Sequence, residues 1–148
     1  NLNVNTFSKP AVEYQKRLRH IIELARKDNK TLPIYIVGIY NPFYLNFPEM
    51  TEMQTIVDNW NQSTEDVCKE YDNVYFVPVN DLLYKGIDGK GGVTSSHETS
   101  QSTKSSQGSL NDALFEDDHF HPNNTGYQIM SDAILKRINQ TKKEWSGE

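Results

Sequence analysis

Apolar residues recur every three or four positions in three segments of the chain, the spacing that places them on one face of a helix. These segments cover residues 10–29, 51–72 and 124–141. In the first segment we expect the charged side chains, including Arg26, to face outward. The apolar stripes consist of Ala11, Tyr14, Leu18, Ile21, Ile22 and Ala25; of Met53, Ile56, Val57, Trp60, Thr64, Val67, Cys68 and Tyr71; and of Tyr127, Ile129, Met130, Ala133, Ile134 and Ile138.

Two shorter segments are apolar without this period. Residues 32–40 read LPIYIVGIY and residues 74–79 read VYFVPV, and both runs are rich in β-branched residues. Such runs are typical of strands that are buried on both faces of a parallel sheet. Pro78 cannot donate a hydrogen bond to a neighbouring strand, so we expect it near the end of the second strand. The alternating order of helices and strands predicts an α/β fold, a three-layer α/β/α sandwich.

Two strands make a small sheet, and each would leave one hydrogen-bonding edge open. We therefore interpret residues 1–148 as the carboxyl-terminal part of one larger domain, whose N-terminal half supplies the missing strands. The start at Asn1 rather than at a methionine agrees with a processed or truncated product. The open edges also predict a homo-oligomer or an exchange of segments between copies.

The composition argues against several kinds of partner and site, and it predicts one mobile segment. The net charge is −5 and the basic residues form no stripe, which argues against nucleic acid. The single cysteine, Cys68, excludes an internal disulfide and a cysteine-based zinc site, and its place in a helical stripe predicts a core position. Residues 86–110 are rich in glycine, serine and threonine and have few large apolar residues, so we expect a mobile loop there.

The sequence EDDHFHPNNTGY at residues 116–127 contains the clearest candidate chemistry. Pro122 favours an extended backbone at His121, and Asn123 or one of the next two residues can cap the last helix. A spacing of three on such a turn lets the Asp118 carboxylate reach one ring nitrogen of His121. The other ring nitrogen is then free to accept a proton from a nucleophile.

The block DDHFHPNNTGYQIMSDAI, together with the preceding strand that ends VGIYNPF, resembles the terminal part of the SGNH (GDSL) ester hydrolases. This resemblance implies a flavodoxin-like SGNH hydrolase fold and a Ser-His-Asp mechanism, with Asp118 as the orienting acid and His121 as the general base. It implies a carboxylic ester hydrolase of the lipase or acylhydrolase type that uses no metal or organic cofactor and acts on a small ester or a lipid. Members are often exported, so the resemblance also implies an extracellular or cell-envelope location.

Two blocks of that family are absent from the chain. The Gly-Asp-Ser-Leu block supplies the nucleophile, and the Gly-x-Asn-Asp block contributes to the oxyanion hole. Residues 108–112, GSLND, imitate both but lack the aspartate before the serine and lie in the polar loop, so Ser109 is not expected to be the nucleophile. We therefore expect the missing half of the domain to supply the serine, and this fragment alone to be inactive.

Several alternatives stay open at this stage. A rival function is a non-catalytic binding or self-assembling module with the same fold. His119 is expected to be a solvent-facing turn residue; the alternatives are a residue of the site wall or a metal ligand together with Asp117 and His121. Phe120 is expected to pack under the turn. The segment formed by Tyr40 and the aromatic loop 41–47 could line an acyl pocket or simply pack in the core and the loop. Its candidate residues are Tyr40, Asn41, Phe43, Tyr44 and Phe47. Asn80 and Asp81 could shape the site or start a turn.

Overall fold

The computed structural model describes residues 8–89 and 110–147. Its elements follow the predicted order, with one additional short helix. Most of the expected mobile loop, including Ser109, lies outside the described residues. The elements are α1 (Ser8–Ala25), β1 (Ile34–Val37), α2 (Glu52–Cys68), β2 (Val74–Val77), α3 (Asn80–Leu83) and α4 (Asn124–Trp145).

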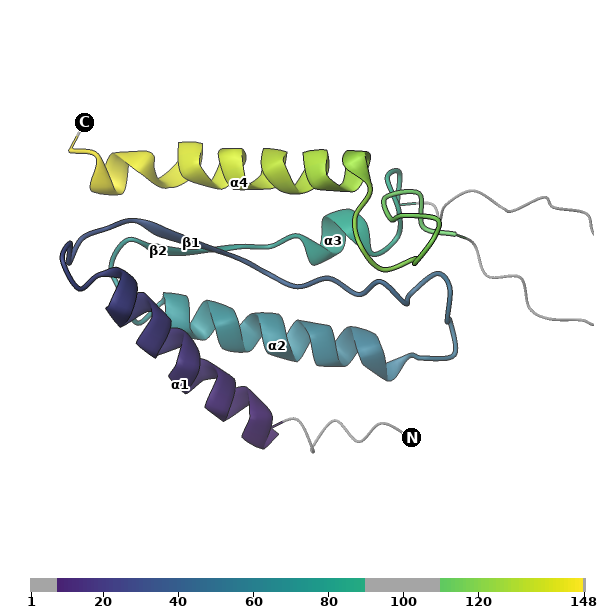
Figure 1. Ribbon diagram of the computed structural model, residues 1–148, viewed down its shortest axis with the longest axis horizontal. Coiled ribbons are helices and arrows are strands. Elements are labelled where there is room, and N and C mark those ends of the chain that lie inside the picture. The colour runs from purple at the N-terminus through teal and green to yellow at the C-terminus, as the bar shows by residue number, and fades with distance from the viewer. Residues whose placement is uncertain (1–7, 90–109, 148) are drawn as a thin grey trace, which may run out of the picture.

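The two strands lie in parallel between two layers of helices (Figure 1). Ile34 pairs with Val74 and Val37 with Val77, and within the described residues the sheet contains these two strands. Helix α4 covers one face of the sheet, and α1 and α2 lie on the other (Figure 1). The predicted α/β fold with a parallel sheet is confirmed.

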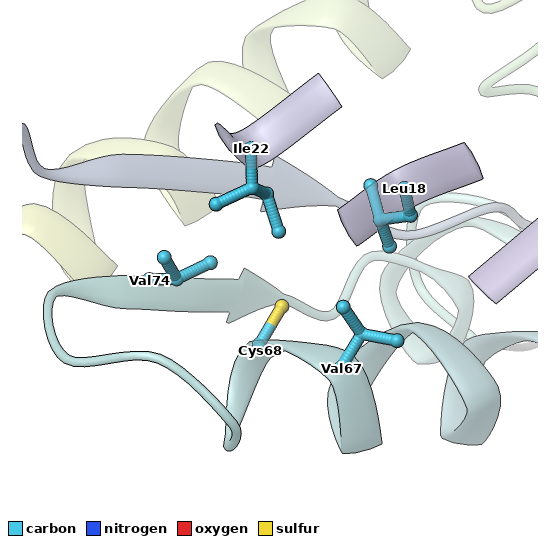
Figure 2. Packing of buried hydrophobic residues seen from close by; sticks show 5 residues of the cluster. All are labelled: Leu18, Ile22, Val67, Cys68 and Val74. Carbon is cyan, nitrogen blue, oxygen red and sulfur yellow. The ribbon is translucent and has the colours of Figure 1, made fainter. Parts of the chain in front are cut away.

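The core has two parts, one on each face of the sheet. Val74 of β2 packs with residues of α1 and α2, and Figure 2 shows this cluster closing around the Cys68 side chain. Val77, which points to the opposite face because side chains alternate along a strand, packs with Leu83 and Ala113 and against α4. Burial raises the pKa of the Cys68 thiol to about 11, so it stays protonated in the core position that its sequence predicts.

Three predicted side-chain orientations in α1 are wrong. Ala25, expected in the apolar stripe, is exposed. Ile21 is 60% exposed, because the neighbouring Ile22 occupies the centre of the buried stripe. Arg26 is only 8% exposed. Its guanidinium donates hydrogen bonds to the carbonyl oxygens of Leu32 and Asp72, at 2.9 and 2.6 Å from Nη2. Arg26 therefore joins the segments that lead into the two strands, which explains its burial despite its charge.

Helix α4 continues beyond the predicted end at residue 141, to Trp145. The indole of Trp145 donates a hydrogen bond of 2.9 Å to the Tyr35 hydroxyl on β1, and the Tyr75 hydroxyl on β2 donates one of 2.8 Å to Glu144. These contacts anchor the last turn of the helix to the sheet. At its other end Tyr127, expected in the core, is 52% exposed. No helix in the described ranges is long and apolar enough to cross a membrane.

Candidate active site

The segment between α3 and α4 folds back on itself just before α4 begins. Leu114 and Pro122 form an isolated antiparallel bridge. The Phe115 amide donates to the His121 carbonyl and the Asn123 amide to the Ala113 carbonyl, both at 2.9 Å. Residues 115–121 are therefore a turn whose two ends are tied together.

Both carboxylate oxygens of Asp118 make hydrogen bonds within this turn. Its Oδ1 accepts hydrogen bonds from the backbone amides of Phe120 and His121, at 2.9 and 3.0 Å. Its Oδ2 lies 2.7 Å from Nδ1 of the His121 ring. The contact expected from the three-residue spacing is therefore present. His119, between the partners, adopts φ of 51°, the left-handed conformation that lets the chain reverse over so few residues.

The charge on Asp118 decides which ring nitrogen carries the proton. The hydrogen bond from the His121 ring, followed by those from the two amides, lowers the pKa of Asp118 from 3.8 to about 2. An ionised carboxylate only accepts hydrogen bonds, so Nδ1 of His121 must be the donor. In the neutral ring Nε2 is then an acceptor. The His121 side chain is 64% exposed, and no hydrogen bond joins Nε2 to any residue in the described ranges.

The titration of Asp118 tests this arrangement. Because the folded pKa lies below the ordinary value, ionised Asp118 stabilises the fold above about pH 4 and this contribution is lost as the pH falls toward 2. Carbon-13 NMR of the side-chain carboxyl should show Asp118 still ionised at pH 3.8 in the native protein. In His121→Ala, which removes the largest cause, the midpoint should move up toward 3.8. A native midpoint at that ordinary value would contradict the geometry.

Residues that follow the two strands hold the turn at the carboxyl ends of β1 and β2. Tyr40, which follows β1, donates a hydrogen bond of 2.6 Å from its hydroxyl to the Phe120 carbonyl. Burial, followed by the nearby Tyr127 and Asp118, raises the pKa of Tyr40 to about 12, so its donor proton is kept at neutral pH. The Asn41 amide donates to Oδ1 of Asn80, which follows β2, at 2.9 Å. The Asp118–His121 pair therefore lies at the carboxyl edge of the sheet, where α/β proteins bind ligands.

The first turn of α4 is built against the same segment. Asn123 is the N-cap residue, and its Oδ1 accepts from the Gly126 amide at 3.0 Å. Its Nδ2 donates to the carbonyls of Asp112 and Leu114, at 2.7 and 3.1 Å. One side chain therefore caps the helix and holds the strand-like segment before the turn.

Gly126 allows this close approach of the helix to the chain. A Cβ at this position would lie 2.2 Å from the Ala113 carbonyl oxygen and 2.9 Å from Cβ of Pro122. We expect Gly126→Ala to lower the free energy of unfolding by about 1–3 kcal/mol, as overpacking does. Urea denaturation measures this change. Thr125→Ala, at the exposed neighbouring position, is the control, and equal midpoints for both variants would contradict the predicted clash.

The structure places the other candidate residues as follows. Phe120 is 46% exposed rather than packed under the turn, and its ring lies between those of Phe43 and His121. His119 is partly buried, and in the described parts of the chain no three His, Cys, Asp or Glu side chains converge as metal ligands would. Asn80 starts α3, and its Oδ1 accepts a hydrogen bond from the Asn41 amide in the loop after β1.

One contact of the site was missed at the level of sequence. The Tyr40 hydroxyl supports a carbonyl 80 residues further along the chain. The signal that could have found it is the position of a tyrosine at the carboxyl end of a buried strand, where side chains converge on the ligand-binding edge.

The chain folds as an α/β protein with a small parallel sheet, and comparison with known proteins identifies its family. Residues 3–129 match the GDSL-like Lipase/Acylhydrolase family, and the chain belongs to this family. It is also similar to a Bacillus subtilis (strain 168) protein named "Uncharacterized protein YpmR", with 30% identity over 143 residues. The match covers 97% of this chain and 46% of that protein, so the chain spans about half of the relative's length.

Proposed function

We propose that this chain supplies the acid and the base of a serine ester hydrolase. The observation that carries the proposal is the 2.7 Å contact between Asp118 and Nδ1 of His121, with Nε2 left open at the carboxyl edge of the sheet. Membership of the acylhydrolase family supports hydrolase chemistry. In this proposal the serine and the oxyanion hole belong to a part of the family domain outside residues 1–148. We use "full-length protein" for the chain together with that part.

In the proposed reaction, Nε2 of His121 takes the proton from the serine hydroxyl as its oxygen attacks the ester carbonyl carbon. The resulting imidazolium is stabilised by the ionised Asp118, which keeps the ring in one orientation and one tautomer. His121 then gives the proton to the leaving alcohol, and the C–O bond to the alcohol breaks. A water molecule repeats the sequence on the acyl-enzyme, releasing the carboxylic acid and restoring the serine. No metal or organic cofactor takes part.

Turnover and active-site labelling test the proposal together. The full-length protein should hydrolyse p-nitrophenyl acetate and react covalently with a fluorophosphonate, and peptide mapping should locate the label on a serine outside residues 1–148. The chain of residues 1–148 by itself should show neither reaction, since it has no Gly-Asp-Ser block. Turnover by residues 1–148 that disappears in His121→Ala would refute the division of the catalytic residues.

A second candidate function is a binding or self-assembling module that uses the open edges of the sheet. This function is favoured by the form of the sheet. Within the described residues β1 and β2 pair with each other, and the outer edge of each strand is unpaired. Parallel pairing leaves the N–H and C=O groups of Tyr35 and Val37 pointing away from β2. Light scattering on residues 1–148 at micromolar concentration discriminates, because a well-folded monomer would contradict assembly through these edges.

A further inference from the structure

Three phenylalanine rings lead to the His121 imidazole in unbroken succession. The ring centroids of Phe47 and Phe43 are 5.9 Å apart, and those of Phe43 and Phe120 are also 5.9 Å apart. The Phe120 ring is 5.3 Å from the His121 ring. These are the separations of rings in contact. We call Phe47, Phe43 and Phe120 the aromatic row; it connects the loop after β1 with the turn that carries His121.

The row presents apolar surface at both of its ends. Phe47 is 45% exposed and Phe120 is 46% exposed, while Phe43 between them is partly buried. Single exposed apolar side chains are common on proteins and need no explanation. Adjacent exposed aromatic rings that end on a polar, chemically competent side chain are the pattern of a ligand site, with apolar walls and a few polar groups.

Hydrogen bonds hold the row in place before any ligand arrives. The Phe43 amide donates to Oδ1 of Asn41 at 3.0 Å, and the Phe47 amide donates to the Phe43 carbonyl at 2.7 Å. Asn41 is 1% exposed and is itself held by Asn80. At the other end the Tyr40 hydroxyl holds the Phe120 carbonyl. The backbone of the row is therefore tied to the ends of both strands, which lowers the entropy cost of binding.

We propose that the aromatic row binds an apolar chain of the ester substrate and makes the enzyme selective for long chains. This inference rests on the proposed function, because that function places the scissile ester bond at Nε2 of His121. A substrate held there has the Phe120 ring as an immediate neighbour, and any chain that extends over it meets Phe43 and then Phe47. The occupant is thus an alkyl chain, on the acyl or the alcohol side of the ester.

Two substrate series measured with the full-length protein test the row. The first varies the acyl chain of p-nitrophenyl esters from acetate to octanoate; the second varies the alkyl alcohol of acetate esters. In one series kcat/KM should rise with chain length, by up to about fourfold for each methylene that becomes fully buried. Phe47→Ser should reduce the ratio of kcat/KM for the longest ester to kcat/KM for the shortest by roughly tenfold. Leu135→Ala, at a position 57% exposed on α4, is the control and should leave the ratio unchanged.

A binding measurement separates this inference from the proposed function. Titration calorimetry with octanoate, which contains no ester, should give a dissociation constant raised about tenfold by Phe47→Ser. If the protein hydrolyses no ester but binds octanoate in this Phe47-dependent way, the proposed function fails and the apolar site stands. An unchanged chain-length ratio in Phe47→Ser would overturn the site. A lower thermal midpoint in the same variant would then mean that the row packs against the rest of the domain.

Discussion

Replacing His121 with asparagine in the full-length protein is expected to lower kcat for p-nitrophenyl acetate by about 10⁴- to 10⁶-fold. Asparagine is neutral and has no basic nitrogen, so it cannot take the serine proton. The residual rate would come from substrate binding and from the oxyanion hole. The fluorophosphonate label should fall in parallel, since its attachment needs the same activated serine. Steady-state kinetics and labelling rates measure the two effects independently.

His119→Asn is the matched control for this variant. It makes the same substitution two residues away, at a backbone conformation with positive φ that asparagine tolerates. Its kcat should stay within about threefold of the native value, the range of a conservative change away from the reacting atoms. Similar losses in both variants would mean that the turn as a whole matters and that His121 has no special chemical role.

Replacing Asp118 with asparagine is expected to lower kcat by about 10²- to 10⁴-fold. The amide oxygen can still accept from the Phe120 and His121 backbone amides, so the turn should persist. The amide nitrogen, in contrast, cannot accept the proton of Nδ1, and the ring loses both its tautomer and its counter-charge. In the proposed mechanism Asp118 acts through His121 as a positioning residue. Water can partly replace it, because its side chain is 44% exposed.

Nitrogen-15 NMR of the His121 ring distinguishes this role from simple destabilisation of the turn. In the native protein the neutral ring should carry its proton on Nδ1, which donates to Asp118. Asp118→Asn removes this acceptor, so the ring should lose its single tautomer. Asp117→Asn, at the exposed adjacent acid, should change neither kcat nor the tautomer. A native tautomer with reduced kcat in Asp118→Asn would contradict the proposed role.

The element order and the central contact of the site were predictable from sequence, because both depend on short separations along the chain. A helical stripe or a strand repeats within a few residues, and Asp118 lies three residues from His121. Proline and asparagine around position 122 act on the adjacent backbone, so the helix start at Asn124 follows the same local rules. The family resemblance rests on this local block and on the earlier strand that ends VGIYNPF, and it is confirmed by the match over residues 3–129.

Only the tertiary structure decided which side chains meet across longer separations. Arg26 is buried because the segments before both strands offer carbonyl oxygens to its guanidinium, 6 and 46 residues away. The turn around Phe120 is held by Tyr40, 80 residues earlier, whose hydroxyl donates to the Phe120 carbonyl. The loop 41–47 could have been core packing or a wall of the site, and its rings reach Phe120 only through the parallel pairing of β1 and β2. The sequence by itself determined the contact between Asp118 and His121, through backbone geometry within one turn. The surroundings of the pair depend on packing between distant segments, which no local pattern encodes.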